Sequence, residues 1–265
     1  MEFELLLFAA GPRDAAEAAG GGVDGLIVDW ERSGKTRRQA SADTEVNDHT
    51  LEDLRSVAAA STAPVVCRLD GPEPSCSEVE VALAEGAREL LLPMVSAPEQ
   101  VERVLEHVGD RCGVGILVET NAAVESAGLL AKLPLTRVYL GLNDLAIERR
   151  SPSIFEAVLD GTLERVREDF RVPFGFGGLT LPRGGRPIRC GLLIGEMMRL
   201  RCSLAFLRRS YRRDLAGAGG HREAIAAIRA GLAQASHRPP ERVEEDRVAL
   251  RAAISAIGAG GAEAR

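Results

Sequence analysis

The sequence lacks the features that would direct it to a membrane, a nucleic acid or an oxidising compartment. No stretch approaches the roughly 20 consecutive apolar residues of a membrane span, and residues 1–4 hold two acids where a signal peptide carries positive charge. The 33 basic side chains, outnumbered by 39 acidic ones, form no long run, which argues against a nucleic acid as the main partner. The five cysteines show neither a Cys-x-x-Cys pair nor a zinc spacing. We therefore expect a soluble cytoplasmic protein with reduced thiols.

What the sequence does contain is a regular succession of short apolar runs. With 45% hydrophobic and 27% charged residues among 265, its composition is that of a globular protein. Eight runs are continuous rather than alternating, which is typical of parallel strands buried on both faces. They cover residues 3–8, 25–31, 63–68, 89–95, 113–119, 137–142, 173–178 and 203–207.

The segments between these runs carry helix-start signals. Thr50 precedes a first turn with acidic residues, Ser96 precedes Pro98, and Ser151-Pro152-Ser153 has a similar pattern. Eight strands, each followed by a helix, predict a (β/α)8 TIM barrel, because parallel strands need crossover connections. The alternative is an open doubly wound sheet, but no Gly-x-Gly-x-x-Gly follows the first run.

The end of the sequence predicts an additional C-terminal helix. We assign residues 1–236 to the barrel and residues 237–265 to a helix and flexible tail of the same domain. The helix is expected to begin at Pro239-Pro240 and to run to about Ile257, before a tail rich in Gly and Ala. Such a helix could pack across the barrel rim or onto a neighbouring subunit.

Charged residues stand where several of the expected strands end. Asp29 and Glu31 end the second run, Arg68 the third, and Glu119 the fifth. In a barrel of this kind the active site is built at these carboxyl ends, so we interpret them as candidate site residues. Each of them taken singly could equally cap a helix or brace a loop.

Two of these strand ends together suggest a metal site. Glu119 and Asp144 follow neighbouring strands, so their carboxylates should lie side by side. Two carboxylates with open positions suit Mg²⁺ or Mn²⁺, which keep several waters and accept substrate oxygens. Asn143 and the fork-shaped cation of Arg68 would then contact a substrate carboxylate or an enolate oxygen.

Four ordered motifs resemble the HpcH/HpaI aldolase and citrate lyase beta-subunit family, whose members are TIM barrels of the phosphoenolpyruvate/pyruvate type. The resemblance covers roughly residues 20–150, and after that only the strand pattern is similar. The motifs are Val28-Asp29-Trp30-Glu31, Val66-Cys67-Arg68-Leu69, Gly86 to Val95, and Glu119 to Val124 followed by Gly141-Leu142-Asn143-Asp144-Leu145.

The resemblance implies a divalent-metal-dependent carbon–carbon lyase or aldolase that acts through the enolate of a 2-oxo acid or a related acyl-CoA. Carried over, Glu119 and Asp144 are the metal ligands, and Arg68 anchors the carboxylate and the enolate oxygen. The resemblance also implies a homo-oligomer, either a trimer or a hexamer. The alternatives are a phosphoenolpyruvate-type transferase or mutase on the same barrel, and a non-catalytic barrel that binds a carboxylate.

The sequence departs from the family at several positions. Related aldolases carry a His directly after the acid of the second strand, whereas Glu31 is followed by Arg32. His49 comes later in the same loop, where a solvated or capping role is the simpler interpretation. Proton transfer would then fall to metal-bound water, to the substrate, or to Asp29 or Glu31, which complete the expected catalytic set with Arg68. Position 94 is Met where relatives often have Lys, and Ala123 replaces a common Gly.

Basic residues in three loops are candidates for a second anion site. Arg183 and Arg186 follow the seventh strand, where barrels often bind phosphate, so we assign them to substrate binding. The long polar segment 32–47 predicts a lid that carries Lys35, Arg37 and Arg38, although it could equally be a solvated loop. The run 208–213 could face the mouth or simply begin a solvated helix. The apolar segment 190–200 is expected to pack against the barrel.

Overall fold

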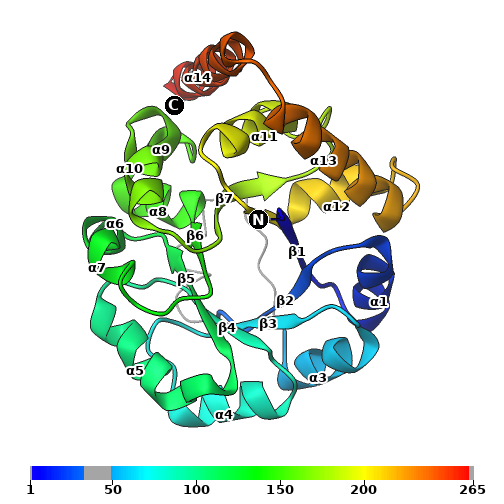
Figure 1. Cartoon of the computed structure of the whole chain (residues 1–265), viewed down its shortest axis with the longest axis vertical. Helices are drawn as coiled ribbons and strands as arrows, with labels where there is room; N and C mark the ends of the chain where they lie inside the picture. Colours follow the sequence, from blue (N-terminus) through cyan, green and yellow to red (C-terminus); the bar gives the residue numbers. More distant parts are fainter. Residues whose placement is uncertain (1, 33–48, 263–265) are drawn as a thin grey trace.

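The computed structural model describes residues 2–32 and 49–262, and the side chains of 258–262 are not described. Eight parallel strands close into a barrel in the order β1 to β8, with β8 pairing back to β1. Helices surround this ring of strands (Figure 1). The architecture confirms the (β/α)8 prediction and excludes the open doubly wound sheet. The strands are β1 (Glu4–Phe8), β2 (Gly25–Asp29), β3 (Val65–Arg68), β4 (Glu89–Leu92), β5 (Gly113–Val118), β6 (Arg137–Leu140), β7 (Phe174–Leu179) and β8 (Leu204–Leu207).

The described helices lie between and after the strands. They are α1 (Pro12–Gly21), α3 (Leu51–Ala60), α4 (Cys76–Ala84), α5 (Pro98–Val108), α6 (Asn121–Glu125), α7 (Ala127–Leu130), α8 (Leu142–Arg149), α9 (Glu156–Leu159), α10 (Thr162–Asp169), α11 (Cys190–Arg199), α12 (Arg209–Leu215), α13 (His221–Ser236) and α14 (Pro240–Ala262), with a short 3-10 turn at Gly109–Arg111. None of the helices in the described ranges is long and apolar enough to cross a membrane.

The helix-start signals were only partly confirmed. Thr50 forms a capping box with Asp53 at the start of α3, as expected. The N-cap of α5 is Ala97 rather than Ser96, because the Gln100 side chain accepts the backbone N–H of both residues. The start expected around Ser151–Ser153 is wrong: this segment forms a turn and α9 begins at Glu156.

Apolar side chains fill the interior of the barrel, and an ion triad lies at the amino ends of its strands. Tyr139 stacks on Phe206 with ring centroids 3.7 Å apart, within an apolar cluster that all but one of the strands supply. At the amino ends of the strands, Arg137 binds both carboxylate oxygens of Glu89 at 2.6 and 2.7 Å and reaches Glu4 at 2.6 Å. Gly115 of β5 leaves room for this ion triad, since a Cβ there would lie 2.8 Å from Glu89 Oε1. The polar mouth therefore lies at the other end.

The C-terminal helix α14 packs against α9 and α11 of its own chain (Figure 1). It runs to Ala262, five residues beyond the expected end at Ile257. Leu250 and Ile254 are its buried residues, and Ile257 lines the cavity at the polar mouth. α14 thus packs against helices that surround the barrel of its own chain.

Candidate active site at the barrel mouth

Arg68 is held between two carboxylates where β2 and β3 end. Asp29 and Arg68 are register partners in the β2–β3 pair. Nε and Nη2 of Arg68 donate to the two Asp29 oxygens at 2.8 and 2.6 Å, and Nη1 lies 3.0 Å from Glu31 Oε2. Side-chain exposure is 4% for Arg68, 0% for Asp29 and 2% for Glu31. Burial alone would lower the pKa of Arg68, but the two carboxylates raise it above its ordinary value, so its charge is permanent.

This arrangement separates the three expected catalytic residues into two layers. Arg68 lines the cavity at the mouth, whereas Asp29 and Glu31 lie behind it and are not part of the cavity wall. Two N–H groups of the guanidinium donate to Asp29, and Nη1 lies at ion-pair distance from Glu31. The carboxylates therefore fix the orientation of the cation that faces the cavity.

Glu119 occupies a recess directly after β5 and is 3% exposed. Its Oε1 accepts the backbone N–H of Met94 at 2.9 Å, and Met94 adopts a positive φ of 54° to present that group. On the other side the backbone of Gly141 comes so close that a Cβ there would lie 2.3 Å from Glu119 Oε2. Residue 141 must therefore be glycine for the Glu119 carboxylate to occupy this position.

Asp144 lies in the first turn of α8 and lines the same cavity as Glu119. Burial, followed by the negative charges of Asp144 and Glu31, raises the pKa of Glu119 to about 8, against the opposing effect of Arg68. The sequence prediction that the two carboxyls would meet at the mouth agrees with this placement. Asn143, the neighbour of Asp144, also lines the cavity.

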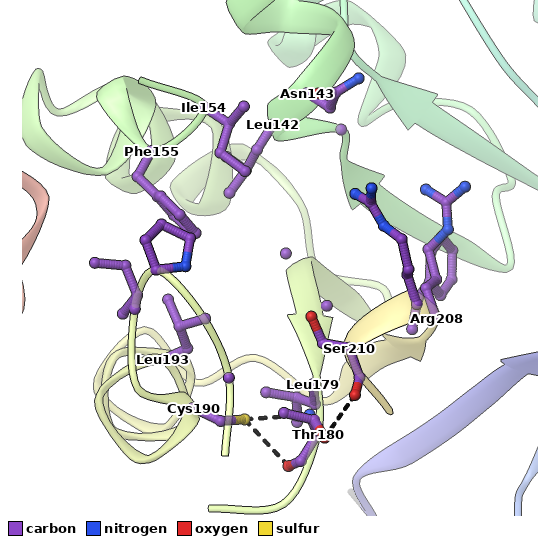
Figure 2. A pocket seen from close by; sticks show the side chains of 18 of the residues that line it. Leu142, Asn143, Ile154, Phe155, Leu179, Thr180, Cys190, Leu193, Arg208 and Ser210 are labelled. Atoms are coloured by element: carbon purple, nitrogen blue, oxygen red, sulfur yellow. Dashed lines mark hydrogen bonds between the residues drawn. The ribbon is translucent and has the colours of Figure 1, made fainter. Parts of the chain in front are cut away.

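The cavity has a volume of about 510 Å³ and two chemically different sides. Leu142, Ile154, Phe155 and Leu193 gather on one side, and Arg208 lies across from them (Figure 2). Arg208 stacks over the Phe8 ring with its Cζ 4.4 Å from the centroid, and Arg68 lies over the same ring at 5.3 Å. Both guanidinium groups therefore lie against the Phe8 ring, which marks one corner of the mouth.

The loop after β7 brings one of its two expected arginines to the cavity. Arg186 lines the wall, whereas Arg183 is exposed and does not. Asp214 of α12 braces this loop: its Oδ2 accepts the Thr180 hydroxyl at 2.7 Å and the Gly185 backbone N–H at 3.3 Å. Sequence reasoning missed Asp214, which lies about 30 residues further along the chain.

The run 208–213 divides between two directions. Arg208 and Arg209 line the cavity, but Arg212 turns away and binds Asp14 of α1 at 2.6 and 2.8 Å. The expected lid residues Lys35, Arg37 and Arg38 lie outside the described residues. His49 caps a strand, since its Nδ1 accepts the backbone N–H of Asp29 at 2.9 Å, which agrees with the capping interpretation.

Cys190 at the start of α11 lines the cavity as a thiol, not as a nucleophile. Its Sγ accepts the N–H of Thr180 at 3.2 Å and donates to the Thr180 carbonyl at 3.1 Å (Figure 2). Burial raises the pKa of the thiol to about 11, so it stays protonated at neutral pH. The segment 190–200 packs against the barrel as predicted, but sequence reasoning missed that Cys190 and Leu193 also face the site.

The sequence of the chain matches a known protein family. Residues 4–154 match the family model described as HpcH/HpaI aldolase/citrate lyase. None of the curated proteins matches the chain.

Solved structures share the fold at low sequence identity. The crystal structure of an HpcH/HpaI aldolase/citrate lyase family protein from Burkholderia cenocepacia J2315 superposes with a TM-score of 0.62 at 17% identity, covering 86% of this chain and 95% of that one. An HpcH/HpaI aldolase from Desulfitobacterium hafniense DCB-2 gives 0.57 at 14% identity, covering 90% and 94%. A 3-hexulose-6-phosphate synthase gives 0.57 at 17% identity, covering 86% and 99%.

Proposed function

We propose that this chain, which belongs to the HpcH/HpaI aldolase/citrate lyase family, is a divalent-metal-dependent aldolase or carbon–carbon lyase. Its substrate would be a 2-oxo acid of the pyruvate type or a related acyl-CoA. The observation that supports this proposal is the buried carboxyl of Glu119, which shares one cavity with Asp144 and the fixed cation of Arg68. Paired carboxylates suit a divalent cation, and a fixed cation suits the oxyanion of an enolate.

The donor set at the mouth fits Mg²⁺ or Mn²⁺. Burial, and after it the negative charges of Asp144 and Glu31, raises the pKa of Glu119, so a divalent cation bound by Glu119 and Asp144 would relieve the repulsion between these carboxylates. Within the described ranges no three His, Cys, Asp or Glu side chains form a complete protein cage. Mg²⁺ commonly uses one or two carboxylates and leaves its other positions to water and substrate. When bound, the cation would polarise the substrate carbonyl and stabilise the enolate charge.

Arg68 would bind the oxygen atoms of the 2-oxo acid that face the Phe8 corner. Because Asp29 and Glu31 hold the guanidinium in one orientation, it needs no rearrangement as negative charge develops on the substrate. In this proposal Asp29 and Glu31 act through Arg68 as positioning residues. Asn143 and Arg186 would contribute further contacts from the wall of the cavity.

The experiment that tests the function is proton–deuterium exchange at the methyl group of pyruvate in D₂O, followed by NMR with Mg²⁺, with Mn²⁺ and with EDTA. We expect exchange that requires metal and falls at least about 100-fold in Glu119→Gln, the scale on which loss of one stabilising group acts. Glu125→Gln, an exposed change outside the cavity on the adjacent helix α6, is the matched control and should retain exchange. Metal-loaded protein without exchange would contradict pyruvate enolisation.

A further inference from the structure

The segment that carries Glu119 is held from two sides. Three consecutive residues follow β5, and each of them is bonded to another part of the chain. Glu119 Oε1 accepts the Met94 N–H at 2.9 Å, and the Thr120 hydroxyl donates to the Val95 carbonyl at 2.7 Å, so the first two residues bind the loop after β4. Asn121, which begins α6, is bonded to α8 instead. The segment therefore links the loop after β4 to α8.

Asn121 binds the last turn of α8 with both its backbone and its side chain. Its N–H donates to Glu148 Oε2 at 2.9 Å, and its Oδ1 accepts the Nε–H of Arg149 at 2.7 Å. Glu148 follows Asp144 by four residues, so the two side chains leave the same face of α8. In Figure 1, α6 and α8 lie side by side. The residue two places after Glu119 is thus bonded to the helix that carries Asp144.

Arg149 also connects the end of α8 to the start of α10. Its Nη1 donates to Asp160 Oδ2 at 3.2 Å and to the Thr162 hydroxyl at 3.0 Å. Thr162 is 4% exposed and so belongs to the interior of the fold. The guanidinium is planar and directs its N–H groups along fixed lines, which lets one side chain bind α6 and α10 at the same time.

The other end of α8 is fixed by the backbone. The Gly141 N–H donates at 3.0 Å to the carbonyl of Val118, the last residue of β5, and α8 begins at the next residue after Gly141. A helix held at one end alone can pivot about that end. Bonds at both ends fix the tilt of α8, and with it the place of Asp144 relative to Glu119.

We propose that Arg149 is a positioning residue for the divalent-cation site. By binding α6 and the start of α10, it holds α8 against the segment after β5 and sets the separation of the Glu119 and Asp144 carboxylates. This inference rests on the proposed function. Arg149 is not part of the cavity wall, so it acts through α8 and not on a ligand. Mg²⁺ demands near-ideal geometry of its oxygen ligands, so displacement of one carboxylate weakens binding.

The first test measures Mn²⁺ affinity by calorimetric titration in two variants that remove the link from opposite sides. Arg149→Met keeps an aliphatic side chain without N–H groups, and Asn121→Ala removes only the side-chain acceptor. We expect each change to weaken Mn²⁺ binding at least about tenfold, the scale on which residues that orient a metal ligand act. The double variant should bind Mn²⁺ no more weakly than Arg149→Met, because both changes break one link. Unchanged affinity in Arg149→Met, or additive losses in the double variant, overturns the proposal.

Arg111→Met is the matched control. Arg111 lies on the 3-10 turn after α5 and donates to both Glu80 oxygens at 2.8 Å, and neither residue lines the cavity. The change removes a comparable ion pair and should leave Mn²⁺ affinity as it is in the parent chain. An equal fall in Arg111→Met and Arg149→Met would mean that the affinity reports general destabilisation, which contradicts a positioning role.

Arg149→Lys separates the geometry of the guanidinium from its charge. Arg149 lies in the last turn of α8, where any cation interacts favourably with the helix dipole. Lys keeps that charge but lacks the planar fork that binds α6 and α10 together. We therefore expect Arg149→Lys to retain most of the thermal stability of the parent chain and to lose Mn²⁺ affinity almost as far as Arg149→Met. Full recovery of the affinity by Lys would overturn the role of the bond to Asn121.

The outcomes separate this inference from the proposed function. Mn²⁺ binding that depends on Arg149, without pyruvate exchange, would overturn the enolisation and support the positioning role. Mn²⁺ binding and exchange in the parent chain, with unchanged affinity in Arg149→Met, would overturn the positioning role and leave the proposed function. A parent chain that binds no Mn²⁺ would overturn both.

Discussion

At the scale of single residues, the site depends on backbone positions as much as on charged side chains. Glu119 is held between the N–H of Met94, presented by a positive φ, and the bare backbone of Gly141. Arg68 is held by the carboxylates of Asp29 and Glu31. In both cases the neighbours determine where the charged group can be, which is what a preorganised site requires.

Gly141→Ala should displace the Glu119 carboxylate without unfolding the barrel. The new Cβ would lie 2.7 Å from Glu119 Cβ as well as 2.3 Å from Oε2, so rotation of the carboxylate alone cannot relieve the contact. We expect Mn²⁺ affinity, measured by calorimetric titration, to fall at least about tenfold.

The matched control for this variant is Gly20→Ala in α1, where a Cβ meets nothing within 4 Å. It should bind Mn²⁺ like the parent chain. Unchanged Mn²⁺ affinity in Gly141→Ala would show that Glu119 does not hold the metal in the geometry described.

At the scale of elements, a cluster of polar side chains, here called the clasp, joins α12 and α13 to β1 and α1. Its members are Asp14, Tyr211, Arg212 and His221. Arg212 of α12 binds both Asp14 oxygens and the carbonyl of Phe8, the last residue of β1. His221 of α13 contacts Asp14 through Nε2 at 3.2 Å and the Tyr211 hydroxyl through Nδ1 at 2.9 Å. The clasp thus secures the seam where β8 meets β1.

The clasp makes the stability of the fold depend on pH, with less stability in acid. Burial would raise the pKa of Asp14, but hydrogen bonds from His221, Arg212 and the backbone of Ala10 lower it well below its usual range. A depressed folded-state pKa stabilises the protein above the unfolded pKa near 4, and this stability is lost as the pH falls through the folded value. We expect Asp14→Asn to lower the free energy of unfolding by about 2 kcal/mol at pH 7, with a deficit that shrinks below about pH 4.

Urea denaturation from pH 7 to pH 3 measures this deficit. Asp110→Asn, at an exposed position on the 3-10 turn, is the control and should show almost no deficit at any pH. An Asp14→Asn deficit that is constant over this range would mean that the carboxylate charge is not what stabilises the seam.

Element positions could be predicted from the sequence more reliably than the contacts between elements. The strand runs are visible because both faces of each strand are buried, so apolar residues follow one another without interruption. The Ser-Pro-Ser pattern at 151–153 gave a wrong helix start because Ser hydroxyls also cap turns, as Ser153 does for Phe155. The Glu119–Asp144 pair was predictable because strand ends converge. The placement of Asp29 and Glu31 behind Arg68 was not, since it depends on strand register and depth.

At the scale of the whole molecule, the terminal helix α14 belongs to the structure that encloses the site. Leu250 and Ile254 are buried against the rest of the barrel, and Ile257 lines the cavity at the mouth. Neither contact is visible in the sequence, because both join segments that are far apart along the chain. If α14 and the barrel form a single domain, as we expect, they should unfold together.

Removal of residues 240–265 should destabilise the entire barrel. Loss of the two buried side chains is expected to cost about 3 kcal/mol and to lower the melting temperature of a single calorimetric transition. A shorter truncation after Ile257 keeps every described side chain of α14 and should leave the transition unchanged. A separate transition that disappears with α14, while the main one stays, would instead make α14 an independent unit.

The ion triad of Arg137, Glu89 and Glu4 closes the amino end of the barrel, and the apolar cluster around Tyr139 and Phe206 fills the interior. Molecules therefore reach the site only from the mouth in the described part of the chain. Glu119 is deeply buried there, whereas Ile154 lies at the surface. A ligand bound at Glu119 would therefore lie deeper in the cavity than one that contacts Ile154.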